Sequence, residues 1–424
     1  MHVMKPGLYH WVVVLDFKSM YPSVMISNNI CFTTLSDDGE IVAPSGTRYM
    51  SPERKKGLLP TILSDLMSQR DDIKKKMKAA STPEEHNYYD GLQAAVKVVM
   101  NTFYGVFASS FYRFTDKSIG ASITSFARNN IKGIISQLED DGYPVIYGDT
   151  DSVFVLSPFH DVENAVKFGT EQADRFSRGG KILEFEKLLD PLFSHGVKKR
   201  YVGRIVWPEA SDDLLVRGYE IRRSDSFDLQ SRMLSELFGK ILDEDEDGAL
   251  ELVRGTISDV LEGKVGPQDL VISRSCAGLD AYENPDRMAN VQCAKKLMEM
   301  GYDFIPGMKV SWVVTDATKT PQVVEPFVSG VPFNHVPDYR YYAKRLAQMA
   351  GRVTEVYGWS EDELLRGSRQ KTLFDGPSGT SVRKGNRNRT DAPVTKSLDD
   401  FFRGRFFFSF RRSVSLRRTT CRTS

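Results

Sequence analysis

Three acidic residues lie where carboxylates could act together on a phosphate ester. Asp16 follows a continuous apolar run, whereas Asp149 and Asp151 lie two residues apart in a Gly-Asp-Thr-Asp-Ser segment. On an extended chain, residues i and i+2 face the same side, so these two carboxylates would crowd each other. Crowded carboxylates repel unless a cation lies between them, and Mg²⁺ prefers such hard oxygen ligands. Two Mg²⁺ ions can activate an attacking hydroxyl and stabilise the leaving oxygen of a phosphoryl transfer.

An ordinary structural explanation competes with this one for each acid. Aspartate caps turns readily, so Asp-Thr-Asp in a turn and an aspartate after a strand are both common. Each signal is therefore weak by itself, and the catalytic interpretation depends on the other motifs along the chain.

Basic and amide side chains on two predicted helices could hold a triphosphate. Arg70 and Lys74 are four residues apart and so share one helix face. Lys97 and Asn101 have the same spacing on the next helix, and Tyr104 follows three residues later. Arginine and lysine are the usual partners of phosphate, and the tyrosine could stack near a base. The alternative is a solvated basic face, since several lysines and aspartates follow Arg70.

The pattern of apolar residues predicts the elements that would carry these side chains. The run 11–15 is typical of a buried strand, and Pro83 separates two helices that would form an antiparallel hairpin. Short apolar segments on both sides of the Asp-Thr-Asp turn indicate a β-hairpin. The last three predicted helices would form a separate helical unit. Helices are predicted at 57–79, 84–104, 122–138, 233–242, 250–261 and 341–356, and strands at 145–147, 153–156, 182–187 and 201–206.

Length and composition narrow the class of protein. A chain of 424 residues is long enough for two or three packed units. Its net charge of +1 neither supports nor excludes nucleic-acid binding, because only the binding groove needs to be basic. The four cysteines form no CxxC pair, which argues against a structural zinc site and fits the reducing cytoplasm. No run of about 18 apolar residues occurs, so no membrane span is expected.

Five motifs, in this order, resemble those of DNA polymerase family B, and their combination is highly specific. The resemblance covers roughly residues 5–365, and the segment around Asp16, with Ser-Asn-Asn-Ile-Cys following at 27–31, resembles archaeal members. The motifs are Asp-Phe-Lys-Ser-Met-Tyr-Pro-Ser at 16–23, Lys-Val-Val-Met-Asn-Thr-Phe-Tyr-Gly at 97–105, Tyr-Gly-Asp-Thr-Asp-Ser at 147–152, Lys-Lys-Arg-Tyr at 198–201 and Gly-Tyr-Glu-Ile-Arg-Arg-Ser-Asp at 218–225.

The resemblance implies an α+β fold with the architecture of a right hand. The palm would be an antiparallel sheet built from residues 1–50 and 105–215. The two-helix fingers would be residues 51–104, and the helical thumb would be residues 216–367. Residues 368–424, where Ser, Gly, Thr, Arg and Asn replace the apolar periodicity, would be a flexible tail.

Functional residues of the family carry over onto the matching positions of this chain. Asp16 and Asp151 would bind two Mg²⁺ ions with help from the Phe17 carbonyl, and Asp149 would be a supporting acid. Tyr21 would lie under the sugar of the incoming deoxynucleoside triphosphate and reject a 2′-hydroxyl by steric conflict. The nucleotide would further be contacted by Ser19, Arg70, Lys74, Lys97, Asn101 and Tyr104, and the DNA by Gly105, Lys198, Arg200 and Tyr201.

The implied activity is that of a DNA-directed DNA polymerase in DNA replication, which extends a primer on its template and releases pyrophosphate. Only 15 residues precede Asp16, so we expect no 3′–5′ exonuclease domain and no intrinsic proofreading in this chain. Two alternatives remain open. The chain could be a non-catalytic module that binds primer-template or a clamp, or a subunit that needs a partner chain carrying the exonuclease half.

The tail contains a segment that resembles a sliding-clamp-binding box. Leu398, Phe401 and Phe402 would enter an apolar pocket of the clamp, whereas Thr395 replaces the usual glutamine. A chance match in a biased tail is the alternative. After Asp400 the chain has seven arginines and no acid, which indicates either a basic arm for nucleic acid or a sequence that is not native to the protein.

Overall fold

The computed structural model describes residues 3–109, 111–112, 116–177, 183–208, 210, 214–219 and 226–366. The chain divides by its contacts into residues 1–370 and 371–424, and the second unit lies outside the described residues. The described part combines helices with antiparallel sheets, which confirms the α+β fold class. The predicted boundaries of palm, fingers and thumb stay predictions. Within the described ranges, no helix has the length and apolar character needed to cross a bilayer.

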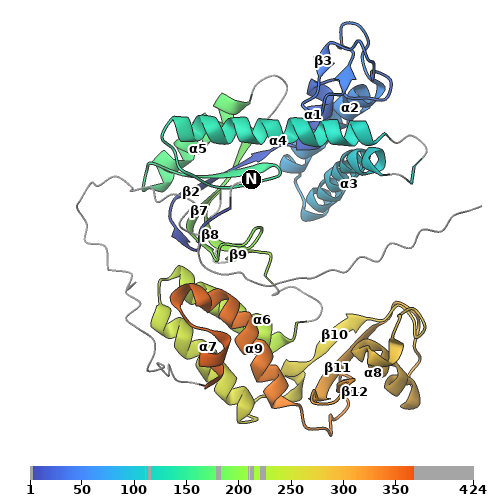
Figure 1. Cartoon of the computed structure of the whole chain (residues 1–424), viewed down its shortest axis with the longest axis vertical. Coiled ribbons are helices and arrows are strands. Elements are labelled where there is room, and N and C mark those ends of the chain that lie inside the picture. Colours follow the sequence, from blue (N-terminus) through green and yellow to red (C-terminus); the bar gives the residue numbers. More distant parts are fainter. Residues whose placement is uncertain are drawn as a thin grey trace, which may run out of the picture. The chain divides into compact units, whose positions relative to one another are not determined.

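A seven-stranded antiparallel sheet forms the region predicted to be the palm (Figure 1). The order is β5-β6-β2-β7-β8-β9, and β1 pairs with one end of the long strand β7. β2 therefore lies between β6 and β7, beside the β5–β6 hairpin. The strands are β1 (Gly7–Tyr9), β2 (Val12–Phe17), β5 (Val145–Asp149), β6 (Ser152–Leu156), β7 (Leu183–Ser194), β8 (Tyr201–Trp207) and β9 (Leu214–Arg217).

Alternating side chains of β2 belong to two different cores. Val13, Leu15 and Phe17 pack with residues of α4 (Lys117–Asp140) and α5 (Val162–Phe176), which cover one face of the sheet (Figure 1). Val12 and Val14 pack in a smaller cluster with side chains of β5, β6 and β7. Residues 12–15 of the strand are all apolar because both of its faces are covered, and by the same alternation Asp16 lies on the second face.

A pair of long helices forms the region predicted to be the fingers. α2 (Leu58–Lys78) and α3 (Pro83–Ala108) contact each other along their length, and α1 (Met20–Ser27) contacts both. Pro83 is the first residue of α3, where its missing N–H costs nothing, and the Thr82 side chain accepts a hydrogen bond from the Glu85 N–H. Both predicted helices are confirmed, and α3 continues one turn further than predicted. A small hairpin, β3 (Ile41–Val42) with β4 (Arg48–Tyr49), precedes α2.

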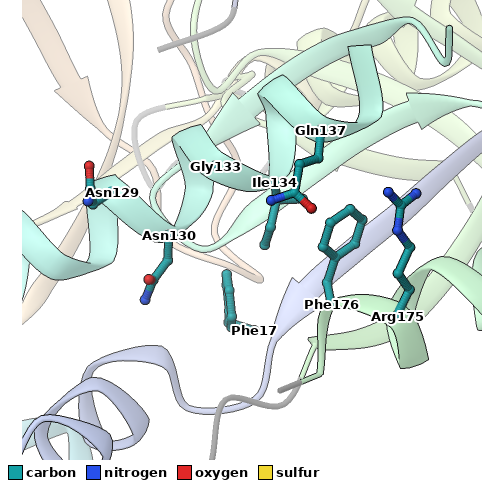
Figure 2. Close-up of a pocket in the computed structure, with 8 residues that line it drawn as sticks. All are labelled: Phe17, Asn129, Asn130, Gly133, Ile134, Gln137, Arg175 and Phe176. Atoms are coloured by element: carbon teal, nitrogen blue, oxygen red, sulfur yellow. The ribbon is translucent and has the colours of Figure 1, made fainter. Parts of the chain in front are cut away.

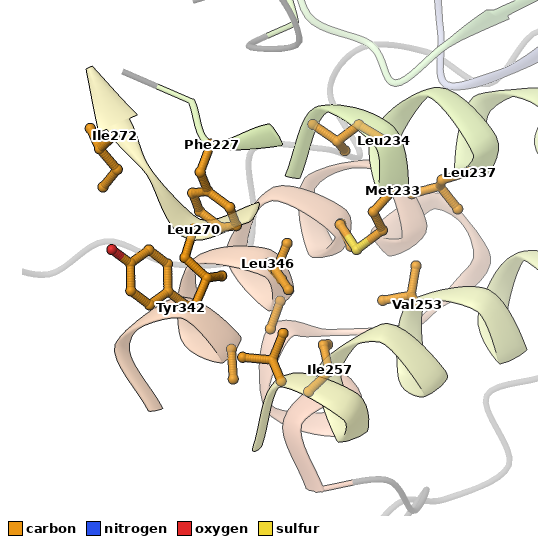
Figure 3. Packing of buried hydrophobic residues seen from close by; sticks show 14 of the residues in the cluster. Phe227, Met233, Leu234, Leu237, Val253, Ile257, Leu270, Ile272, Tyr342 and Leu346 are labelled. Atoms are coloured by element: carbon orange, nitrogen blue, oxygen red, sulfur yellow. The ribbon is translucent and has the colours of Figure 1, made fainter. Parts of the chain in front are cut away.

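The third region, predicted to be a helical thumb, also contains a sheet. The predicted helices correspond to α6 (Asp228–Leu242), α7 (Glu246–Leu261) and α9 (Tyr339–Thr354), whose apolar side chains share one core (Figure 3). Between α7 and α9 lies an antiparallel sheet of β10 (Ile272–Ser275), β11 (Lys309–Asp316) and β12 (Val323–Pro326), with α8 (Ala289–Glu299) against it. This sheet was not predicted from the sequence, because two of its strands have only four residues. α10 (Glu361–Arg366) follows α9.

Candidate active site

The β5–β6 hairpin carries two of the predicted acids at its tip. Asp149 ends β5 and pairs with Ser152, so the turn consists of Thr150 and Asp151. Thr150 has a φ of 45°, in the left-handed region that tight hairpin turns use. The two aspartates are therefore not on one extended strand, as their spacing had predicted. The tight turn, and not the alternation of side chains along a strand, brings the two carboxylates close together.

The backbone of β2 places Asp16 beside this turn. Asp16 pairs with Ser152 of β6, and the Phe17 N–H donates a hydrogen bond to the Asp151 carbonyl oxygen at 3.0 Å. Both contacts are between main-chain groups, so they fix the positions of the carboxylates without using the carboxylates themselves. Phe17 has its side chain buried on the helix-covered face.

The carboxylates at this site are crowded and partly shielded from water. Burial, followed by repulsion from Asp151 and Glu186, raises the pKa of Asp16 to about 7. The pKa of Asp151 is also raised, chiefly by burial and further by Asp149 and Glu186. Neither acid has a basic side chain close enough to cancel these effects, although Lys187 and Lys199 oppose them. The site therefore favours a bound cation when its acids are ionised.

Glu186 is an acid that the sequence analysis missed. It lies on β7 and lines a cavity of about 170 Å³ together with Asp16, Tyr201 and Arg217. Its signal was present in the predicted strand 182–187, where Glu184 and Glu186 alternate with apolar residues. Glu184 pairs with Asp16 across the sheet, and the register shift of β7 at Glu186 leaves the Glu186 side chain in the cavity that Asp16 lines.

The donor set fits a hard divalent cation such as Mg²⁺. Asp16 and Asp151 offer carboxylate oxygens, and Glu186 adds negative charge nearby. Within the described ranges, no three acidic, histidine or cysteine side chains form a ready-made ligand cluster. Asp16 and Asp151 are thus the residues that would hold such an ion, with other ligands supplied from outside the side chains of this site.

The Lys-Lys-Arg-Tyr segment contacts the β5–β6 hairpin. The contact is made by Lys199, a residue of the motif that was not predicted to have a role. The Lys199 ammonium forms an ion pair with Asp149, and the backbone N–H of Lys199 donates a hydrogen bond to the Tyr147 hydroxyl at 3.0 Å. Lys198 is exposed, and Arg200 is half-buried. Tyr201 begins β8, and burial raises its pKa to about 12. The second lysine of the motif thus contacts a predicted catalytic acid.

Two tyrosines from different elements meet beside the acids. Tyr21 of α1 and Tyr104 of α3 have ring centroids 4.4 Å apart. The pKa of Tyr21 is raised by burial first and then by Tyr104, Asp151 and Asp149. The structure therefore brings together two residues predicted to contact the nucleotide. At this position the charges of Asp151 and Asp149 act on Tyr21.

The predicted phosphate ligands on α2 are not a solvated basic face. Arg70 is only 8% exposed, and its Nε and Nη2 donate to Gln93 Oε1 of α3 at 3.3 and 3.0 Å. The pKa of Lys74 is lowered by burial and by Arg70, whereas Glu184 of the sheet opposes this effect. Lys74 thus lies within electrostatic range of Glu184 on β7, and the surface alternative for Arg70 is wrong.

The remaining predicted site residues occupy simpler positions. Ser19 precedes α1 with a φ of 51°, and its carbonyl accepts a hydrogen bond from the Ser23 N–H at 3.0 Å. Lys97 and Asn101 are exposed on α3, and a Cβ at Gly105 would meet no atom within 4 Å. The predicted clamp-binding residues Thr395, Leu398, Phe401 and Phe402 lie outside the described residues.

A larger cavity lies on the other face of the sheet. It has a volume of about 520 Å³, and Figure 2 shows Phe17 together with Asn129 and Asn130 of α4 and with Arg175 and Phe176 at its wall. Phe17 and Asp16 are neighbours on β2 and face opposite ways. The larger cavity is therefore separated from the carboxylates by the sheet itself, and size alone does not mark the reactive site.

The fold is shared with a solved DNA polymerase. A solved structure, titled the family B DNA polymerase from the hyperthermophilic archaeon Pyrobaculum calidifontis, is similar to this chain with a TM-score of 0.62 and 27% sequence identity. The similarity covers 84% of this chain and 46% of that one. The model of DNA polymerase family B matches residues 2–356, and the chain belongs to that family.

Curated relatives include catalytic subunits of DNA polymerase delta. The rice subunit is 32% identical over 408 residues, which are 88% of this chain and 37% of the relative. The fission yeast subunit is 32% identical over 399 residues, which are 85% of this chain and 36% of the relative. The chain therefore spans a little over a third of the length of these relatives.

Removal of the Asp16 charge should stabilise the metal-free protein. Folding raises the pKa of Asp16 from 3.8 to about 7, so its ionisation costs stability as the pH rises through that interval. After allowance for solvent screening, we expect Asp16→Asn to gain about 1–2 kcal/mol at roughly pH 8, or about 2 °C in Tm. Calorimetry in EDTA checks this gain, which should shrink toward about pH 5. Added Mg²⁺ should stabilise the wild type more than the variant, and an unchanged Tm at the higher pH would contradict the assignment.

Gly218→Ala should weaken primer-template binding. Gly218 has a φ of 72°, and a Cβ there would lie 2.1 Å from the Lys199 carbonyl oxygen, so the Lys-Lys-Arg-Tyr segment would have to shift. We expect the Kd for primer-template DNA, measured by fluorescence anisotropy, to rise by about 10-fold. The control is Gly239→Ala on α6, where a Cβ meets no atom within 4 Å. Equal affinities for the two variants would show that this close approach does not position the segment.

Proposed function

We propose that this chain is the polymerase portion of a DNA-directed DNA polymerase that adds deoxynucleotides to a primer 3′-hydroxyl. The observation that carries the proposal is the placement of Asp16 beside Asp151, next to the contact between Tyr21 and Tyr104. Carboxylates that crowd one another at one end of a sheet, beside a buried basic helix face, suit nucleotidyl transfer better than simple binding. The names of the relatives support the same class of reaction.

The residues of the sheet would prepare the reacting groups. Asp16 and Asp151 would hold two Mg²⁺ ions, with the Phe17 carbonyl as a further oxygen ligand. When bound, Mg²⁺ supplies charge that favours ionisation of the 3′-hydroxyl and offsets the negative charge that develops at the α-phosphate. Asp149 would stay paired with Lys199, which keeps the charge of Asp149 from adding fully to the repulsion at Asp151.

The helices would hold the incoming nucleotide. Arg70 and Lys74, with Lys97 from α3, would bind the triphosphate, and Ser19 would contact it from the start of α1. Tyr21 would support the sugar and leave no room for a 2′-hydroxyl, and Tyr104 and Asn101 would line the new base pair. Binding through several fixed groups would align the α-phosphate with the primer terminus, which is the main contribution that a protein makes to phosphoryl transfer.

The primer-template would lie along the segment that follows β7. Lys198, Arg200 and Tyr201 would contact the primer backbone, and Gly105 of α3 would allow close approach of the DNA because its surroundings are open. Phosphate contacts of this kind position a duplex without reading its sequence, as a polymerase requires.

Asp151→Asn should abolish primer extension. The wild type should extend a DNA primer in the presence of Mg²⁺ and four deoxynucleotides, and the variant should lose roughly 1,000-fold or more in kcat. Asp243→Asn, at the exposed end of α6, is the matched control and should keep full activity. If the wild type binds primer-template but does not extend it, a non-catalytic module or a subunit that needs a partner chain is the better explanation.

We also propose that the tail binds a sliding clamp through Leu398, Phe401 and Phe402. Phe401→Ala with Phe402→Ala should reduce capture by an immobilised cognate clamp by about 10-fold, because paired aromatic anchors dominate binding of this kind. Phe406→Ala with Phe407→Ala, in the same tail, is the matched control and should leave capture unchanged. Equal capture of both double variants and the wild type would refute the clamp contact.

A further inference from the structure

An ion pair joins the strand that carries Asp16 to the helix that carries Arg70 and Lys74. The Lys18 ammonium lies 2.7 Å from Asp71 Oδ1 and 2.9 Å from Oδ2. Its side chain is 16% exposed, and that of Asp71 is 41% exposed. Fully exposed ion pairs contribute little, but a cation withdrawn from water to this extent interacts more strongly with its partner.

The Lys18 end of the pair is held rigidly relative to the acids. Lys18 lies two residues after Asp16 in the turn that leads from β2 into α1. Its carbonyl accepts a hydrogen bond from Ser23 Oγ at 3.0 Å, and the preceding Phe17 N–H bonds to Asp151. The position of the Lys18 backbone is therefore fixed by the same contacts that fix the predicted metal ligands.

The Asp71 end lies among the predicted phosphate ligands. Asp71 directly follows Arg70 and precedes Lys74 by three residues, so it lies on the same part of α2. Arg70 is bound to Gln93 of α3, which ties α2 to its helical partner. α2 is thus fixed from two sides, by α3 through Gln93 and by the sheet through Lys18.

Asp71 also balances charge where three cations approach one another. The pKa of Lys74 is lowered by burial, by Arg70 and by Lys18, whereas Glu184 and Asp71 act in the opposite direction. The carboxylate of Asp71 therefore offsets part of the repulsion that Lys18 exerts on Lys74, and it does so from a fixed position in the ion pair.

We propose that the Lys18–Asp71 ion pair positions the phosphate-binding face of α2 relative to Asp16 and Asp151, and so determines the affinity for the incoming nucleotide. Lys18 and Asp71 are positioning residues, which act through Arg70 and Lys74 and do not touch the triphosphate. The inference rests on the function proposed above and adds a determinant of its nucleotide site.

Nucleotide binding without chemistry gives the first test. The Kd of dTTP would be measured in Mg²⁺ with a dideoxy-terminated primer and a templating dA, by the fluorescence of a labelled template. Lys18→Met and Asp71→Asn should each raise this Kd by about 10-fold, because a misplaced binding group loses much of its contribution. The double variant should be no weaker than either single one, since both remove the same interaction.

Three controls separate positioning from other effects. Lys18→Arg keeps the charge and should keep most of the affinity. Asp72→Asn removes the neighbouring Lys75–Asp72 pair on α2, whose side chains are 78% and 62% exposed, and should change nothing. The Kd for primer-template should be the same in all variants. In single-nucleotide incorporation, the KM for dTTP should rise more than kcat falls.

Other outcomes would overturn the inference. An effect of Lys18→Met without one of Asp71→Asn would mean that Lys18 contacts the triphosphate directly. Losses that multiply in the double variant would mean independent roles, and unchanged affinities throughout would mean that the pair has no role in binding. If the wild type binds dTTP but does not incorporate it, the proposed activity fails while the cycle still decides the role of the pair. If the wild type does not bind dTTP at all, both proposals are refuted.

Discussion

Repulsion between partly buried carboxylates is the constraint on which the rest of the site depends. Asp16 and Asp151 cannot be held by attraction to each other, so main-chain pairing has to hold them. Ser152 is the key position, because it pairs with Asp16 on β2 and with Asp149 on β5. The pairing of Ser152 therefore fixes Asp16, Asp149 and the adjacent Asp151 at one point where three strands meet. The hydrogen bonds of the whole sheet offset the repulsion between these acids.

Three basic side chains around the site each have a hydrogen-bonding partner within the protein. Lys199 is bound to Asp149 and Lys18 to Asp71, while Arg70 is held by a neutral amide from Gln93. Lys199, Lys18 and Arg70 are thus oriented before a nucleotide arrives, and for Arg70, which would contact the triphosphate, this lowers the entropy lost on binding. The net charge of +1 for the whole chain conceals this arrangement, because the local balance and not the total decides what the site attracts.

Much of the fold and the site followed from local patterns in the sequence. The apolar run before Asp16, the hairpin around Thr150 and the two long helices are set by neighbouring residues, so periodicity predicted them. Glu186 and Lys199 were missed because their roles arise from pairing between distant segments. Lys18 and Asp71 are 53 residues apart, and no spacing rule connects a turn of a sheet with a helix that follows it so much later. The left-handed turn was missed for another reason, since Asp-Thr-Asp also fits an extended chain.

Strand β2 separates an apolar core on one face of the sheet from the carboxylates on the other face. Its odd-numbered side chains, from Val13 to Phe17, complete a core under helices, and its even-numbered ones, from Val12 to Asp16, end at the reactive face. Side chains along a strand alternate with a period of two, so the loss or gain of one residue within this stretch would exchange the two sets. An aspartate would then enter the apolar core, and a phenylalanine would take its place among the carboxylates. The length of β2 therefore constrains the site more tightly than the identity of its apolar side chains does.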